Sequence, residues 1–176
     1  MLGSVPCNGS TPRPSAPHVR STDAVVLATL ARGSAHSATF RRLLEQLEMS
    51  DVIVHVERRP RWERPHGATR FIAATPYARY LRITIAATDA SDAIVALLGH
   101  ELRHAVETAD APEVVDESSF HALYRRIGHA SCAPPQWCFD TATAVRTGID
   151  VYTELRRVRR SARLSSAQHH ERQGDD

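Results

Sequence analysis

The spacing of apolar residues along the chain changes its period several times, and each change predicts a different element. An apolar stretch over residues 24–32 follows Asp23, a helix-capping residue, and precedes Gly33, a helix stop, so we predict a first helix there. After Ser37 the apolar residues recur at helical spacing with charged residues between them. These apolar residues are Phe40, Leu43, Leu44 and Leu47. They predict a second, amphipathic helix.

Three short segments then have the composition of strands. Residues 51–57 are rich in β-branched side chains, and residues 80–85 alternate between apolar and polar positions. Residues 70–74 form a third candidate, which ends before Pro76. Because the connections are short, we expect a small antiparallel or mixed sheet.

Helical periodicity returns in the second half of the chain. An apolar stripe predicts a long helix over residues 91–109, followed by Pro112 as a stop signal. The stripe consists of Ile94, Leu98, Leu102, Ala105 and Ala109. Further helices are expected over residues 117–127, ended by Gly128, and over residues 140–160. The predicted fold class is therefore α+β, with a small sheet packed on the helix of residues 91–109.

The two ends of the chain differ in composition from the centre. Residues 1–22 are rich in Pro and Ser and predict a flexible tail, and residues 161–176 predict a polar C-terminal tail that frays. The remaining residues, 23–160, are enough for a single domain of ordinary size.

Composition excludes several classes of protein. The hydrophobic fraction of 42% and the charged fraction of 24% are typical of soluble globular domains. No apolar run is long enough to cross a bilayer, so no membrane partner is expected. The net charge of +2 is too small to indicate nucleic acid binding. The first ten residues lack the features of a secretory signal, so a soluble protein is predicted, with the cytoplasm favoured and export left open.

The chain has three cysteines, Cys7, Cys132 and Cys138, and an odd number argues against a disulfide framework. Cys132 and Cys138 flank a Pro-rich loop of a length that a disulfide can close. Two reduced thiols in that loop are the alternative.

The helix of residues 91–109 contains an H-E-x-x-H motif formed by His100, Glu101 and His104. Because a helix turns by about 100° per residue, His104 returns to within about 40° of His100, one turn along. Two imidazoles at this spacing can bind one Zn²⁺ ion. Glu101 lies beside them, where it can accept a proton from a water molecule bound to the zinc.

A catalytic zinc site commonly has a third protein ligand. We predict Asp140, which opens the last long helix; an N-cap role fits its position equally well. His121 and Glu117 are the next candidates. Glu107 lies about 10 Å along the helix from His100, so it is expected to support a ligand or to be a solvated charge. The remaining downstream carboxylates and imidazoles are Asp110, Glu113, Asp116 and His129.

The run LLGHELRHAVE over residues 97–107 resembles the active-site helix of the zincin metallopeptidases. Two histidines followed by a later carboxylate are similar to the gluzincin branch, although Asp140 would replace the usual Glu. The chain also resembles a group of small, uncharacterised bacterial zincin-like proteins, in segments over residues 50–56, 78–83, 122–128 and 139–141. Residue 110 is Asp, so the third His of the metzincins is missing.

This resemblance implies a zinc metallopeptidase that acts on a peptide or protein substrate. His100, His104 and Asp140 would be the metal ligands, and Glu101 would be the general base. A second donor should stabilise the oxyanion, and His121 and Tyr124 are the first candidates. Arg125, His129 and Tyr152 are further ones. If residues 79–85 form an exposed edge strand, a peptide can pair with it; the alternative is an ordinary half-buried strand.

Two other classes of function compete with this hypothesis. The site can bind zinc without catalysis, as a structural or sensing module. Arginines crowd the end of the last predicted helix and could bind nucleic acid, but cations there also complement the helix dipole, which is the favoured interpretation. These arginines are Arg156, Arg157, Arg159, Arg160 and Arg163. The sequence does not predict the oligomeric state.

Overall fold

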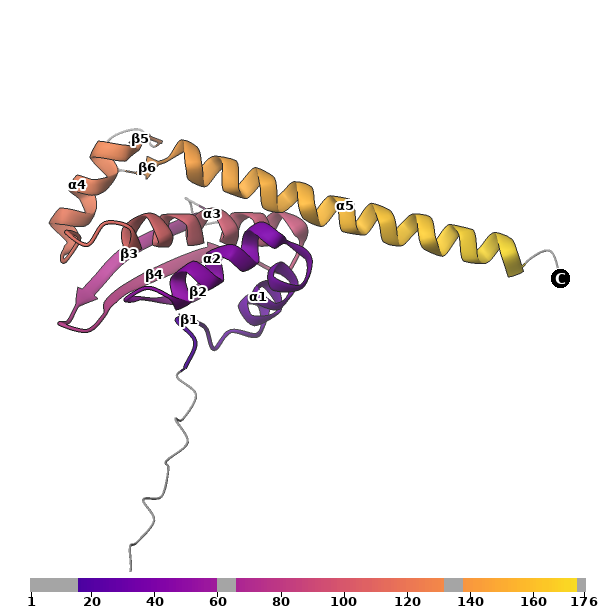
Figure 1. Cartoon of the computed structure of the whole chain (residues 1–176), viewed down its shortest axis with the longest axis horizontal. Coiled ribbons are helices and arrows are strands. Elements are labelled where there is room, and N and C mark those ends of the chain that lie inside the picture. The colour runs from indigo at the N-terminus through magenta and orange to yellow at the C-terminus, as the bar shows by residue number, and fades with distance from the viewer. Residues whose placement is uncertain (1–15, 60–65, 132–137, 174–176) are drawn as a thin grey trace, which may run out of the picture.

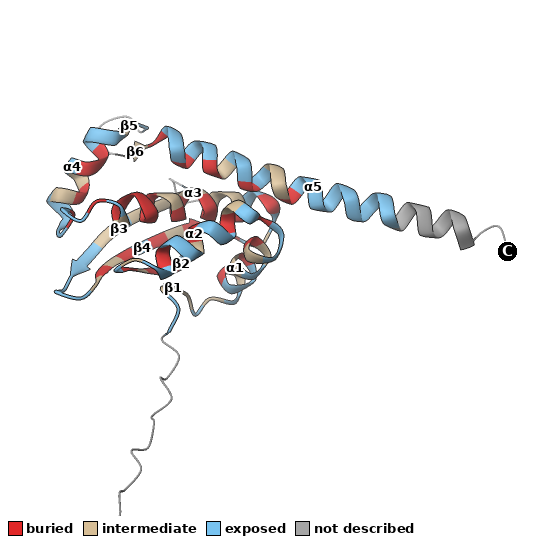
Figure 2. Cartoon of the chain, viewed as in Figure 1, coloured by how far each residue is buried: buried red, intermediate tan, exposed pale blue. Residues whose placement is uncertain are grey.

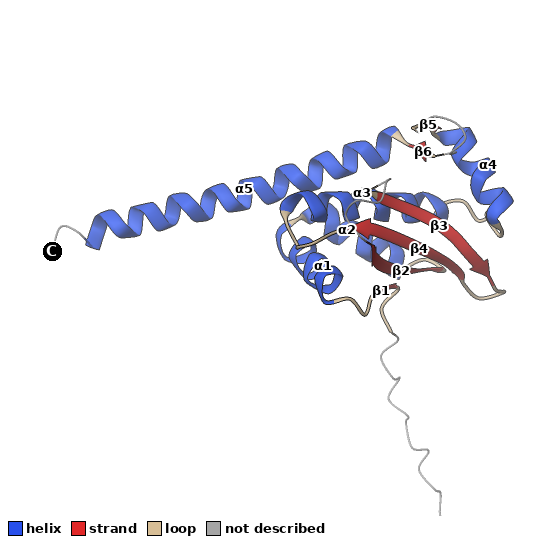
Figure 3. Cartoon of the chain, turned by 180° about the vertical axis from the view of Figure 1, so that it is seen from behind, coloured by secondary structure: helices blue, strands red, loops and turns tan. Residues whose placement is uncertain are grey.

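The computed structural model describes residues 16–59, 66–131 and 138–173, with side chains described as far as residue 165. Four strands form one mixed sheet in the order β1-β2-β4-β3. Helix α3 lies between this sheet and the long helix α5 (Figures 1 and 3). The α+β class predicted from the sequence is confirmed.

The strands of the main sheet are β1 (Val19–Arg20), β2 (Val52–Arg59), β3 (Gly67–Ala74) and β4 (Arg79–Ala86). A second, two-stranded sheet pairs β5 (His129–Ala130) with β6 (Phe139–Asp140). The helices are α1 (Ala24–His36), α2 (Ala38–Glu48), α3 (Asp92–Ala109), α4 (Glu117–Ile127) and α5 (Ala142–Gln173).

Strand β4 lies inside the sheet. It pairs in parallel with β2, where Val54 is opposite Leu81, and in antiparallel with β3, where Arg70 is opposite Arg82. The hypothesis that residues 79–85 form an exposed edge for a peptide is therefore wrong. Within the described part of the chain, β3 pairs with β4 alone, so β3 is the strand that offers a free edge beside α3.

The core lies between the sheet and α3 (Figure 2). Alternate residues of β2 and β4 point inward and are fully buried or nearly so, as period-2 strands require. They meet Leu98 and Leu102 of α3, which are also fully buried. Burying each such side chain stabilises the fold by roughly 1.5–3 kcal/mol, and this burial fixes α3 against the sheet.

Helix α1 does not end at Gly33, as the sequence analysis expected, but continues to His36. An ideal Cβ at position 33 would lie 2.7 Å from Cδ1 of Phe40, which is too close for any side chain. Gly33 therefore allows Phe40 of α2 to pack closely against α1. The next helix begins as predicted: the hydroxyl of Ser37 accepts a hydrogen bond of 3.0 Å from the backbone N–H of Phe40.

Both predicted tails contain regular structure where the chain is described. Residues 19 and 20 form β1, and the backbone N–H of Val54 donates to the carbonyl of His18 at 2.8 Å. Helix α5 continues to Gln173 and projects beyond the body of the molecule (Figure 1), so its predicted end at residue 160 is wrong. From residue 149 to residue 173 the chain has no Gly or Pro to end a helix. No helix in the described residues is long and apolar enough to cross a membrane.

Candidate metal centre

His100 and His104 on α3 face Asp140 of β6. The Nε2 atom of His100 lies 3.3 Å from Oδ1 of Asp140, and Nε2 of His104 lies 3.7 Å from the same oxygen. One ligand atom from each of the three residues lies within 4.8 Å of the others. The packing of α3 against the start of α5 brings them together, since Asp140 is two residues before α5 begins.

These separations suit a single small cation. Around a tetrahedral ion with bonds of about 2.0–2.1 Å, neighbouring ligand atoms are about 3.3–3.4 Å apart. Two imidazoles and one carboxylate are a donor set that zinc accepts, and other divalent transition metals accept it as well. The residues therefore fit a metal ion but do not specify which one.

Glu107 orients His104 from the side opposite the candidate metal. Its Oε2 lies 3.0 Å from Nδ1 of His104, and its Oε1 accepts a 2.7 Å hydrogen bond from the hydroxyl of Thr141. Both side chains of the His104–Glu107 pair are more than nine-tenths buried. Nδ1 of His104 is thus engaged by Glu107, and Nε2 is the nitrogen turned toward Asp140.

Asp140 does not cap α5, which was the alternative to its role as a ligand. The hydroxyl of Thr141 accepts the hydrogen bond from the backbone N–H of Ala144, at 3.0 Å, and so fills the capping role. Asp140 accepts a bond of 2.7 Å from the N–H of Thr141 through Oδ1, the oxygen nearest both histidines. This contact holds the carboxylate beside the imidazoles.

Glu101 is buried next to the two histidines and is anchored by the edge strand. The hydroxyl of Thr69 on β3 donates a 2.8 Å hydrogen bond to Oε2 of Glu101. Gly67 leaves room for the carboxylate, because an ideal Cβ there would lie 2.3 Å from Oε1. Burial raises the pKa of Glu101 above its ordinary value, and the Thr69 bond and the positive charge of His104 only partly oppose this.

The two histidines have different electrostatic surroundings. Burial and the neighbouring His104 lower the pKa of His100. Burial also lowers the pKa of His104, but the hydrogen bond with Glu107 and the charge of Glu101 outweigh burial and raise that pKa overall. The surroundings of His100 therefore favour its neutral form, which can bind a metal. Those of His104 favour its protonated form through two neighbouring carboxylates.

A cleft of about 710 Å³ opens onto these residues. Edge strand β3 forms one wall, and α4 contributes Phe120 and Tyr124 opposite it. The side chains of His100 and Asp140 remain about one-fifth exposed, at 21% and 22%. A ligand in the cleft can therefore reach the candidate metal centre.

Tyr124 and His121, the first candidates for an oxyanion donor, both line this cleft. The hydroxyl of Tyr124 donates a 2.7 Å bond to the backbone carbonyl of His104, and its ring meets the imidazole edge-on with centroids 5.2 Å apart. Tyr124 therefore packs against His104, one of the candidate metal ligands. Nε2 of His121, whose side chain is 44% exposed, lies 3.7 Å from Oε1 of Glu117, which also lines the cleft; neither residue belongs to the metal cluster.

The other candidates lie away from the cleft. Glu113 pairs with Arg126 at 2.6 Å, and Asp116 caps α4 through Ser119. The remaining candidates are exposed, and one of them, His129, pairs with Asp140 in the small sheet. These are Asp110, Arg125, His129 and Tyr152. None of them joins the metal cluster.

Sequence reasoning missed three residues that shape the site: Gly67, Thr69 and Thr141. Each acts through a contact between elements distant in sequence, and none belongs to a recognisable motif. Cys138, at the mouth of the cleft, is disulfide-bonded. Because Cys138 is disulfide-bonded, the alternative of two reduced thiols is wrong; Cys7 and Cys132 lie outside the described residues.

Three comparisons with known proteins find no match: no family model, no curated protein and no solved structure matches the chain. The zincin-like fold therefore stays a prediction from the motif-bearing helix.

Proposed function

We propose that the protein is a zinc-dependent peptidase whose metal is held by His100, His104 and Asp140. The observation that carries this proposal is the convergence of three ligand atoms beside a buried carboxylate, in a cleft bordered by a free strand edge. The zincin resemblance of residues 97–107 supplies the choice of zinc and of peptide bonds.

The protein's own residues divide the work of hydrolysis. Zinc, when bound, supplies Lewis-acid activation of the scissile carbonyl and makes water a stronger acid. Glu101 accepts the proton of the attacking water and then passes it to the leaving amine. Thr69 holds the Glu101 carboxylate in place through its 2.8 Å bond, and Glu107 fixes the orientation of His104.

The free edge of β3 supports an extended peptide as substrate. An edge strand presents backbone N–H and C=O groups to which another chain can add as a strand. Thr69 and Phe71 of this strand line the cleft, and Thr69 contacts Glu101 directly. A peptide paired with β3 would therefore pass beside the candidate metal centre.

The test is hydrolysis of a diverse library of short unstructured peptides, read by mass spectrometry with the zinc-loaded full chain. Glu101→Gln should keep its zinc and lose at least about 100-fold in rate, because it removes the general base. Glu57→Gln on the exposed side of β2 is the matched control and should retain full activity. If wild type binds zinc but cleaves no peptide, the peptidase proposal is wrong and a non-catalytic zinc module takes its place. If Glu101→Gln cleaves as wild type does, Glu101 is not the general base.

A further inference from the structure

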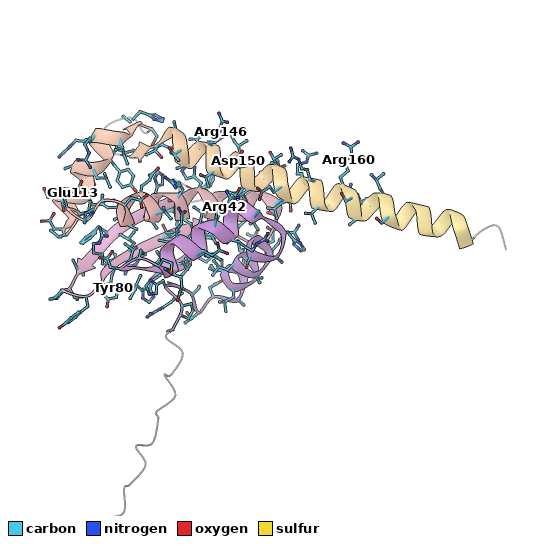
Figure 4. All side chains as sticks on the ribbon, viewed as in Figure 1. Arg42, Tyr80, Glu113, Arg146, Asp150 and Arg160 are labelled. Atoms are coloured by element: carbon cyan, nitrogen blue, oxygen red, sulfur yellow. The ribbon has the colours of Figure 1, made fainter. Side chains whose placement is uncertain are left out.

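A second cavity, of about 520 Å³ and widely open to solvent, lies between α2, α3 and α5, and Arg42, Arg146 and Asp150 on its rim are exposed. It shares no lining residue with the cleft at the candidate metal centre. Figure 4 shows Arg42 on α2 and Arg146 and Asp150 on α5, the two helices that flank this cavity. Its volume falls in the range of ligand pockets, about 300–1,000 Å³.

Helical spacing places one row of side chains from α5 along the wall and rim of the cavity. Thr143, Arg146, Thr147 and Asp150 recur at intervals of three and four residues, which places them on the same face of the helix. Arg42 of α2 faces them, and Arg103 of α3 lies between the two helices. Hydroxyls and guanidinium groups thus surround a single space.

The charges in the cavity are not balanced by the protein. Three guanidinium groups meet one carboxylate, that of Asp150. Within the described part of the chain, Arg42 and Arg146 have no hydrogen-bond or ion-pair partner. Because Arg103 is also 3.8 Å from the carboxylate of Glu107, an excess of one positive charge remains available to a ligand.

Arg103 adds an independent observation. Its Nε atom is buried and makes no hydrogen bond, and the nearest carboxylate oxygen, Oε1 of Glu107, is 3.8 Å away, beyond hydrogen-bonding distance. A buried donor without an acceptor costs free energy. An anion seated in the cavity would reduce this cost.

We propose that this cavity binds a phosphate group, either as free phosphate or as part of a small phosphorylated molecule. A phosphate group carries between one and two negative charges near neutral pH, which matches the excess charge of the cavity. Planar guanidinium groups bind its oxygens in pairs, and the hydroxyls of Thr143 and Thr147 can donate to the remaining oxygens. The cavity is larger than one phosphate, so it has room for the organic part of a phosphomonoester.

The proposal is tested by isothermal titration calorimetry of the full chain at constant ionic strength. Inorganic phosphate, adenosine monophosphate and adenosine are the probes, and adenosine should not bind. Binding of either phosphate-bearing probe supports the site, and tighter binding of the nucleotide identifies a small molecule as the source of the phosphate. If neither binds at millimolar concentration, the proposal is wrong.

Variants separate this site from a general attraction between charges. Arg42→Gln and Arg146→Gln should each weaken binding about tenfold or more, because each removes a charged donor. Arg157→Gln, on the exposed surface of α5 outside the cavity, removes the same charge and should have little effect. Asp150→Asn should tighten binding, a change that loss of structure cannot produce. Equal weakening by all three arginine substitutions would show that phosphate binds by net charge alone, and no tightening in Asp150→Asn would show that phosphate does not bind in this cavity.

Discussion

The imidazole of His104 and the carboxylate of Glu107 are joined by a hydrogen bond of 3.0 Å between Nδ1 and Oε2. Four positions separate His100 from His104, and three more reach Glu107, so a single helix supplies two candidate ligands and the group that orients one of them. Because Nδ1 of His104 faces Glu107, Nε2 is the nitrogen that faces Asp140 and is left for a metal ion.

Glu107→Ala should weaken zinc binding by about 10–100-fold, because His104 loses the partner that sets its tautomer and ring orientation. Competition titration with a zinc chelator measures this change. Glu57→Ala, on the exposed side of β2, is the control and should bind zinc as wild type does. An unchanged zinc affinity in Glu107→Ala would remove Glu107 from the metal centre.

Thr141→Val should destabilise the protein by about 1–2 kcal/mol, because its hydroxyl caps the start of α5 and also donates to buried Glu107. Urea unfolding measures the loss. Thr141→Ser keeps the hydroxyl and should remain close to wild type. If Thr141→Val is as stable as wild type, the hydroxyl has no role in stabilising the fold.

Gly67→Ala should reduce hydrolysis without loss of zinc. The added Cβ would lie 2.3 Å from Oε1 of Glu101, so the carboxylate must move away from the position in which Thr69 holds it. We expect a fall in rate of about tenfold or more, since general-base catalysis depends on the position of the base. Parallel measurement of zinc content and peptidase rate checks this, and full activity with an intact fold would contradict the role given to Glu101.

Acid should weaken the fold in part through Asp51. The guanidinium of Arg79 donates to both carboxylate oxygens of Asp51, at 2.8 and 2.6 Å, and these bonds hold the pKa of Asp51 below its ordinary value of 3.8. A lowered pKa in the folded state means that the stabilisation is complete above the ordinary value and is lost as pH falls through the folded value.

The variant Asp51→Asn isolates this contribution. The difference in unfolding free energy between wild type and Asp51→Asn should be largest near neutral pH and should shrink below about pH 4. Urea unfolding over a pH series measures it. A difference that stays constant to the lowest pH at which the protein folds would show that Asp51 is not ionised in its contact with Arg79.

Local periodicity predicted α2, α3, α4, β2 and β4, because each has one buried face that the sequence pattern records. Apolar alternation in β4 also identified its buried residues, but it did not reveal that β3 and not β4 is the free edge. Strand order depends on contacts between segments, which the pattern of a single strand does not contain. The sequence underestimates the extent of α5, because the polar composition of residues 161–173 is typical of a fraying tail.

The sequence predicted the metal ligands of the candidate site but not the residues that position the site. Helical geometry alone brings His100 and His104 together, and a carboxylate before the last helix was the natural third member, Asp140. Thr69 and Thr141 were not predictable, since threonine is common and each acts through a single long-range contact. The residues that position the site are therefore known only from the folded chain.

The central claim is tested most directly by the zinc content of the purified full chain, measured by mass spectrometry of the metal beside His100→Ala, His104→Ala and Asp140→Ala. We expect wild type to bind one zinc ion per chain and each variant to lose it while remaining folded by circular dichroism. Equal zinc content in wild type and in both histidine variants would contradict the assignment of the metal centre.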